Sequence, residues 1–184
     1  MKLARLFRRR EPAAHPLYGH IVAQARQPDF YLAGEVPDTV QGRFEMIALH
    51  MFLVLHRLKQ EGGQGADLAQ DLFDLMFQDM DRNLRELGTG DLSVGKRIKA
   101  LAKELYGRIA AYEAGLNRGP GTTDLEQALA RNVFANEQVT PGGLKVLADY
   151  LRRSVEALAI QSYDDISAGR VVFAAPDVQA NRSE

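Results

Sequence analysis

The apolar residues of this 184-residue chain recur mostly at the spacing of helices. Leu17, Ile21 and Ala25 lie four residues apart and predict a first helix that begins near Pro16 and that Pro28 ends. Apolar and polar residues do not alternate as in a strand, except in a stretch near the C-terminus that is too short to define a sheet. The pattern predicts an all-α fold with one compact domain of about six to seven helices.

Capping and turn residues divide the remaining chain into further helices. Asp38 or Thr39 can cap a long helix to about Gln60, which a glycine cluster at 62–65 closes. The helices predicted after this cluster cover 66–87 and 93–116, then a short helix to about Ala135 that opens with the capping-box pair Thr123 and Glu126, and a last long helix that begins at Thr140 and Pro141.

Composition narrows the class of protein. The chain has no cysteine, which excludes disulfides, zinc–thiolate sites and thiol nucleophiles. It also has no apolar run of the ~20 residues needed to span a bilayer. We expect a cytosolic protein with one helical domain at 16–173, a basic amphipathic tail at 1–15 and a polar tail at 174–184.

The N-terminal tail carries a charge opposite to that of the body. Its five cations give +5, so the other residues carry −6 within a net charge of −1 (−1 minus +5). Leucine and phenylalanine alternate with these cations, so the tail could contact an anionic membrane or ribosomal RNA, or remain in solvent. The predicted contact residues are Lys2, Arg5, Arg8, Arg9 and Arg10.

The helix predicted at 66–87 has more apolar surface than one packing face requires, because its apolar side chains cover an arc of roughly 200°. The flank with Phe73 and Phe77 is either covered by another helix or open to an apolar partner. Met76 and Met80 would make such a surface adaptable. Surplus apolar surface beside a basic tail suggests that the protein recognises another protein near a membrane.

Polar residues interrupt this apolar arc. Asp79 and Asn83 project into its middle, where an unpaired carboxylate would be costly to bury. Arg43, Arg85 or Arg108 could supply charged hydrogen bonds. We therefore predict a buried polar network in preference to an acid or base role.

No pattern for a cofactor, a metal or catalysis is complete. Gly90, Gly95 and Lys96 match a phosphate-binding loop, but Arg97 stands where the magnesium-binding hydroxyl should be, and no strand precedes the loop. Asp79, Asp81 and Asn83 imitate the start of a calcium loop that lacks its glycine and its final glutamate. The long helix predicted to about Gln60 carries two histidines, His50 and His56. They are six residues apart and do not share a helical face as a metal-binding pair would.

Five blocks of sequence resemble the ubiquinol–cytochrome c chaperone family. As a set and in this order they are more specific than any one alone, and the resemblance covers about 16–173. The blocks are GRFEMIALH at 42–50, LHRL at 55–58, QDLFDLMFQDMDRNLRELG at 70–88, GDLSVGKRIK at 90–99 and YGRIAAY at 106–112.

The resemblance implies a non-enzymatic assembly chaperone. Mitochondrial members bind newly made cytochrome b and help to assemble the cytochrome bc complex, so this chain would do similar work in a bacterium, peripheral to the inner face of its inner membrane and without a cofactor. The hypothesis assigns client binding to an apolar groove of Phe73, Met76, Phe77 and Met80 flanked by Tyr106 and Tyr112, and the shape of that groove to a polar network of Arg43, Asp79, Asp81, Arg85 and Arg108.

One alternative is a regulator that binds nucleic acid. The segment 90–105 can be interpreted as the turn and recognition helix of a helix-turn-helix, with Lys96, Lys99 and Lys103 facing phosphates. The acidic body argues against this, because DNA-binding modules generally carry net positive charge. No specific nucleic acid is therefore expected as a partner.

Overall fold

Helix α3 (Val40–Leu58) runs through the middle of the structure, and nearly all of its residues are buried. It starts as predicted, because Thr39 Oγ1 accepts a hydrogen bond of 3.1 Å from the Gly42 amide. The structure is a computed structural model that describes residues 13–86, 91–119, 122–135 and 139–176. A helix that is apolar on every side must be enclosed, and the other helices pack around α3.

Within the described residues, six helices of nine residues or more and two five-residue helices form the fold, without a strand. This confirms the predicted all-α class. Besides α3 the elements are α1 (Ala14–Ala25), α2 (Pro28–Leu32), the 3₁₀ turn η1 (Lys59–Glu61), α4 (Gly63–Glu86), α5 (Asp91–Asn117), α6 (Asp124–Asn132), α7 (Pro141–Ala159) and α8 (Tyr163–Ser167).

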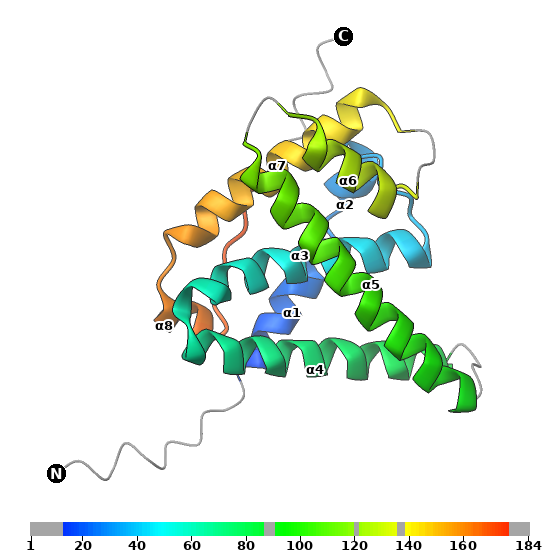
Figure 1. Cartoon of the computed structure of the whole chain (residues 1–184), viewed down its shortest axis with the longest axis vertical. Coiled ribbons are helices and arrows are strands. Elements are labelled where there is room, and N and C mark those ends of the chain that lie inside the picture. Colours follow the sequence, from blue (N-terminus) through cyan, green and yellow to red (C-terminus); the bar gives the residue numbers. More distant parts are fainter. Residues whose placement is uncertain (1–12, 87–90, 120–121, 136–138, 177–184) are drawn as a thin grey trace, which may run out of the picture.

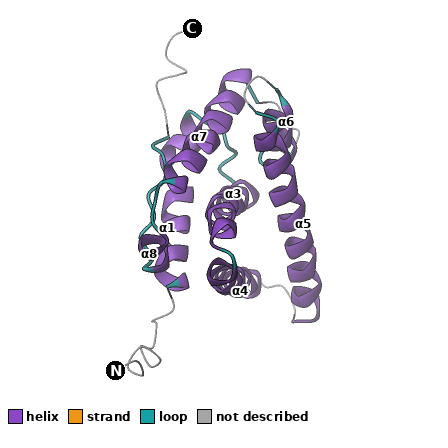
Figure 2. Ribbon diagram, turned by 60° about the vertical axis from the view of Figure 1, so that its left-hand side comes forward, coloured by secondary structure: helices purple, strands orange, loops and turns teal. Residues whose placement is uncertain are grey.

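The long helices surround α3 on several sides. Figure 1 shows α4 below α3, with α5 rising diagonally from one end of α4 toward α6 and α7 at the top. In the turned view of Figure 2, α3 lies between α1 and α5. Contacts of α3 with α1, α4, α5 and α7 agree with both views. Helices α4 and α5 therefore form the two sides of an angle, and α3 contacts both of them.

The glycine cluster after α3 differs from its prediction as a simple loop. Gly62 has a positive φ of 60° and ends η1, but Gly63 and Gly65 already belong to α4. A Cβ atom on Gly65 would lie 2.0 Å from the Leu58 carbonyl oxygen. Glycine is needed here because the first turn of α4 approaches the end of α3 closely.

The predicted capping box at the start of α6 is wrong. Thr123 caps no amide, and its hydroxyl instead accepts a hydrogen bond from the Gln127 side chain at 3.0 Å. Glu126 turns to an ion pair of 3.2 Å with Arg152 of α7. The cap predicted at Thr140 does form, since its hydroxyl accepts from Gly143 at 3.1 Å.

Two short helices and one boundary were not predicted. Helix α1 begins at Ala14, two residues before Pro16. Pro28 ends α1 as predicted but also opens α2, where its missing N–H costs no hydrogen bond. Helix α8 follows α7, and the segment after it crosses back over the body, where the Val172 amide donates to Gln161 Oε1 at 2.9 Å.

Candidate functional site

A groove lies between α4 and α5, with the end of α3 as its floor. Its volume is about 370 Å³. Small residues on the α4 side leave room for it, whereas aromatic and aliphatic side chains form the rest of its apolar wall. The residues that line it include Leu55, His56 and Lys59 from α3 and η1, Ala66, Ala69 and Phe73 from α4, and Tyr106, Ile109 and Glu113 from α5.

Stacked aromatic rings form one end of this groove. The ring of Phe73 lies 5.4 Å from that of Tyr106, centroid to centroid, with an interplanar angle of 27°. Phe77, one turn along α4, stacks on Phe73 at 6.3 Å. Tyr106 is 60% exposed although it is a large apolar ring. Exposed aromatic rings on a fixed helical wall are typical of surfaces that bind an apolar partner.

The opposite end of the groove is polar. Lys59 Nζ donates to Glu113 Oε1 at 3.0 Å. His56 Nδ1 lies 3.7 Å from the same carboxylate oxygen, which is too far for a hydrogen bond. The groove thus changes along its length from aromatic to polar, with one cation and one acid paired at the polar end.

The six residues predicted to bind a client do not share one surface. Phe73 and Tyr106 line the groove between α4 and α5, and Phe77 stacks on Phe73 next to it. Met76 and Tyr112 are fully buried in the core and do not reach a surface, which corrects their predicted role. Tyr112 packs instead against Phe52 of α3, with a centroid distance of 5.4 Å.

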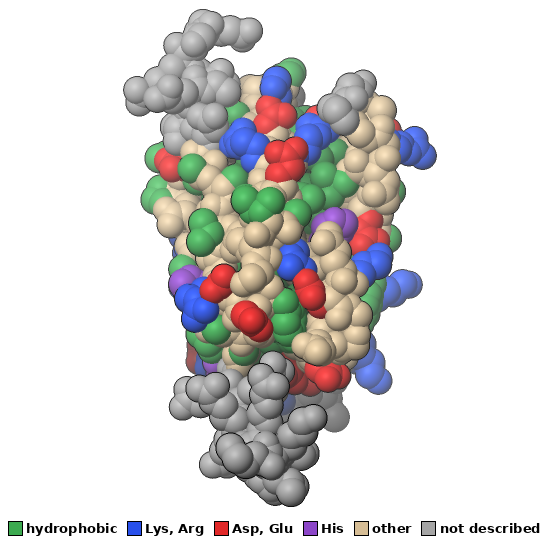
Figure 3. All heavy atoms as spheres, turned by 90° about the vertical axis from the view of Figure 1, so that its left-hand side faces the viewer, with side chains coloured by type: hydrophobic (Ala, Val, Ile, Leu, Met, Phe, Trp, Pro, Cys, Tyr) green, Lys and Arg blue, Asp and Glu red, His purple; other side chains and the backbone are tan. Residues whose placement is uncertain are grey.

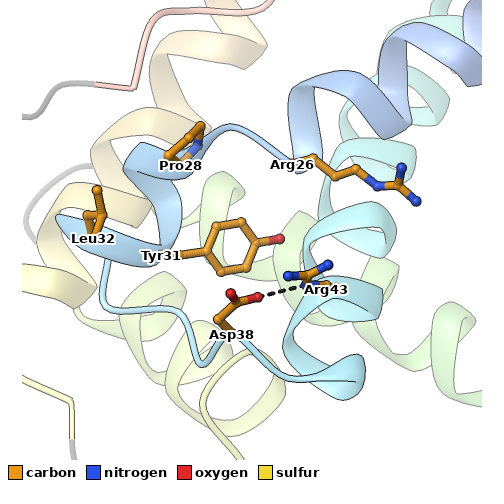
Figure 4. A pocket seen from close by; sticks show the side chains of 6 residues that line it. All are labelled: Arg26, Pro28, Tyr31, Leu32, Asp38 and Arg43. Atoms are coloured by element: carbon orange, nitrogen blue, oxygen red, sulfur yellow. Dashed lines mark hydrogen bonds and ion pairs between the residues drawn. The ribbon is translucent and has the colours of Figure 1, made fainter.

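Met80 lines a second hollow, two turns farther along α4 toward its C-terminal end. This cavity of about 350 Å³ is also bounded by Val40, Phe44 and Ile47 of α3. It adjoins a hollow of about 330 Å³ that includes Tyr31. Figure 4 shows the Tyr31 ring projecting from α2 toward the paired side chains of Asp38 and Arg43. Met80 is therefore separated from the Phe73 and Tyr106 rings.

The predicted polar network is also not one network. Arg43 pairs with Asp38 at 2.7 Å, next to the start of its own helix. Asp81 pairs with Arg85 along α4 at 2.6 Å. Both pairs are exposed, and Arg108 lies on a different helix. In these contacts Arg43 and Asp81 make ion pairs with near neighbours in the sequence, and neither pair includes Arg108.

Asp79 finds partners other than the three arginines predicted for it. Its carboxylate accepts a hydrogen bond of 3.1 Å from the Tyr18 hydroxyl of α1 and pairs with Arg82 on its own helix. Burial, with the adjacent Asp79 charge, raises the pKa of Tyr18 above its ordinary range. Asn83 lines a hollow with Phe44, Ile47 and Met80, as its predicted place in the apolar arc implies, but it is exposed and so needs no buried partner.

Glu45 of α3 and Arg108 of α5 form a buried ion pair between these two helices. Arg108 Nε and Nη2 each lie 2.5 Å from a Glu45 oxygen, and the guanidinium stands over the Phe44 ring at 5.7 Å. Burial raises the pKa of Glu45, and Arg108 opposes that shift. The pair fixes α5 to α3, so Glu45 is an ion-pair partner for a neighbouring helix.

His50 is fully buried in a polar cluster that joins three helices. Its Nδ1 lies 2.7 Å from the Met46 carbonyl, so Nδ1 carries the proton, and Nε2 accepts from the Tyr150 hydroxyl at 2.7 Å. Gln24 of α1 donates to the same hydroxyl at 3.2 Å. Burial lowers the pKa of His50 to about 4, so it is neutral at physiological pH. These hydrogen bonds give His50 a structural position in the core.

The described residues offer little support for metal or nucleotide chemistry. They contain no group of three or more histidine or acidic residues that could hold a metal ion. Gly95 and Lys96, from the near match to a phosphate-binding loop, lie inside α5. Lys96, Lys99 and Lys103 are exposed on that helix. Gly90 lies outside the described residues, as do the predicted membrane or ribosome contacts Lys2, Arg5, Arg8, Arg9 and Arg10.

One further face of the surface is mixed. On the face that carries α8, Figure 3 shows small groups of apolar side chains separated by acidic and basic ones. Among the helices that the structure describes, none combines the length and apolar character needed to cross a bilayer. The aromatic end of the groove between α4 and α5 therefore remains the candidate site.

Comparisons with known proteins identify the family. Residues 33–173 match the family described as ubiquinol–cytochrome C chaperone. The ubiquinol–cytochrome c reductase complex assembly factor 1 proteins of Mus musculus and Homo sapiens are both 27% identical over 170 residues, which is 92% of this chain. The chain spans a little over half of those two relatives, 57% and 56% of their lengths.

A solved structure has the same fold. The crystal structure of the Cbp3 homolog from Brucella abortus is 40% identical and superposes with a TM-score of 0.82, covering 94% of this chain and 96% of the other. The family match extends over most of the helical domain, including both walls of the groove. The chain therefore belongs to the ubiquinol–cytochrome c chaperone family.

Proposed function

We propose that this chain is an assembly chaperone that binds newly made cytochrome b through the groove between α4 and α5. In doing so it would assist assembly of the ubiquinol–cytochrome c reductase complex. Family membership supports the proposal, as do the names of its mouse and human relatives, which describe them as assembly factors for that complex. A non-enzymatic role without a cofactor fits this proposal, since binding alone protects an apolar client.

The observation that carries the proposal is the exposed Tyr106 ring stacked on Phe73. The Tyr106 ring is large and apolar, and it is 60% exposed. A partner that covers it is therefore bound more tightly, by about 25 cal/mol for each Å² of apolar area removed from water. Stacking against Phe73 fixes the ring in place and reduces the entropy lost on binding. An unassembled transmembrane segment has the apolar surface that such a site would cover.

We also propose that the protein acts at the cytoplasmic face of the inner membrane, where cytochrome b is inserted. The basic tail, with Lys2, Arg5 and Arg8–Arg10, would then contact anionic lipid or the ribosome. Each cation next to anionic lipid contributes about 1 kcal/mol, so this contact would be reversible. Reversible attachment suits a factor that must leave once its client has been assembled.

The test is capture of cytochrome b from a membrane-containing lysate after brief crosslinking. We expect Phe77→Asp and Tyr106→Glu to abolish or strongly reduce the recovered cytochrome b. Ile160→Asp is the matched control, because Ile160 is 88% exposed beyond α7 and away from the groove. Each variant must keep the helical circular dichroism spectrum and the unfolding midpoint of the wild type.

Tyr106→Glu is included because Phe77 is partly buried, whereas the Tyr106 ring needs no burial for folding. If both folded variants recover as much cytochrome b as the wild type does, the groove is not the client site. If the wild type itself recovers none, binding to cytochrome b is contradicted as well.

A further inference from the structure

The α5 wall of the groove presents an aromatic ring and an acid on the same helical face. Ile109 and Glu113 follow Tyr106 by three and seven residues. This spacing places the three side chains on one side of the helix. At 1.5 Å per residue, Glu113 lies roughly 10 Å along the axis from Tyr106. All three line the groove. A segment lying along α5 would meet the aromatic ring first and the carboxylate about two turns later.

The Glu113 carboxylate retains capacity to bind another cation. Its side chain is 26% exposed, and within the described residues its hydrogen-bond donor is Lys59, which is 71% exposed. A carboxylate can accept about four hydrogen bonds. His56, beside it, is too far away to donate one. An incoming ammonium or guanidinium group could therefore join or replace Lys59.

We propose that the groove recognises the end of a transmembrane helix by two features, an apolar stretch over Phe73 and Tyr106 and a lysine or arginine on Glu113. This inference rests on the proposed function and adds the chemistry of the bound segment. Cytoplasmic ends of transmembrane helices are enriched in these cations, so the occupant is the cytoplasmic end of such a helix. The groove complements that end in both shape and charge.

The same arrangement disfavours other apolar segments. An acidic flank would be repelled by the Glu113 carboxylate and could pair only with Lys59, which would first have to leave Glu113. A neutral flank would gain no ion pair. The cation must also be placed about seven residues from the apolar residues that cover Tyr106, if the segment is helical and lies along α5. A cation two residues away from that position would point to another side of the helix.

The test uses the full chain and three helical Leu/Ala peptides of about 20 residues in mild detergent, which carry Lys, Gln or Glu at one end. We expect the Lys peptide to bind the wild type roughly fivefold more tightly than the Gln peptide. Glu113→Gln should remove this preference, and Glu113→Lys should transfer it to the Glu peptide. Lys59→Met should strengthen binding of the Lys peptide, because it removes the competing cation.

Glu156→Gln is the matched control, since Glu156 is an exposed acid on α7, outside the groove. Equal binding of the Lys and Gln peptides to the wild type would overturn the charge inference but leave the apolar groove intact. If Tyr106→Glu weakened none of the peptides, the groove itself would be excluded, and the proposed function with it. If Glu113→Gln still preferred the Lys peptide, another acid would be responsible for the preference. That result would also overturn the inference.

Discussion

Glu45 of α3 and Arg108 of α5 form a two-pronged ion pair in which the carboxylate is 1% exposed and the guanidinium 11% exposed. Both nitrogen–oxygen distances are 2.5 Å. Arg108 also pairs with Glu104, one turn earlier on α5, at 3.3 Å. The pair connects the floor of the groove to one of its walls, so it should contribute both to stability and to the position of Tyr106.

Removal of Arg108 should be strongly destabilising. Arg108→Met leaves a buried carboxylate without its cation, and we expect a loss of about 3–5 kcal/mol in the free energy of unfolding. Adding Glu45→Gln should recover part of that loss, because a neutral amide is less costly to bury. Urea denaturation measures both variants, with Lys145→Met in an exposed pair of α7 as the control, expected to cost less than about 1 kcal/mol. Equal stability of all three variants would contradict a buried pair.

His50 should make stability depend on pH. Its folded pKa of about 4 lies below the ordinary value of 6.5, so the folded protein binds fewer protons than the unfolded chain. Its contribution, about 3 kcal/mol, is fully present above pH 6.5 and is lost as the pH falls toward 4. Between pH 7.5 and 4.5, the free energy of unfolding should fall more steeply with decreasing pH for the wild type than for His50→Gln. Parallel pH profiles would show that His50 is not buried as a neutral side chain.

Two glycines of α5 should respond in opposite ways to alanine. A Cβ atom on Gly115 would lie 2.8 Å from the Leu125 Cα atom, so Gly115→Ala should force α6 away and cost about 1–3 kcal/mol. Gly107 has nothing within 4 Å of its added Cβ, and Gly107→Ala should stabilise the helix by roughly 0.5–1 kcal/mol. Thermal unfolding should give a lower midpoint than the wild type for Gly115→Ala and a higher one for Gly107→Ala. A loss of stability in both would indicate that α5 packs differently.

Local signals explain which parts of the fold could be predicted from the sequence. Leu17, Ile21 and Ala25 are buried as their spacing indicates, and Thr39 caps α3. Helices α2 and α8 are too short to repeat an apolar pattern, with one buried residue each. The sequence predicts a loop at 62–65, whereas Gly63 and Gly65 belong to α4. In one sequence, a glycine that is needed for close contact with α3 cannot be told from a glycine that ends a helix.

The site was only partly predictable for a similar reason. The apolar arc of α4 identified Phe73 and Phe77, but periodicity does not say which part of a wide arc faces the core, so Met76 was assigned to the surface although it is fully buried. Glu113 was missed because its role in the groove depends on Lys59, which is 54 residues away in the sequence. Long-range contacts of this kind leave no periodic signal in one sequence.

The most direct test of the account is site-specific photo-crosslinking in cells that assemble the reductase complex. A benzophenone side chain would replace Tyr106 in one variant and Ile160 in the other, since both are exposed but only Tyr106 lines the groove. We predict crosslinks to cytochrome b from position 106 and not from position 160. Crosslinks of equal yield from both positions, or none from position 106 while the complex still assembles, would contradict this prediction.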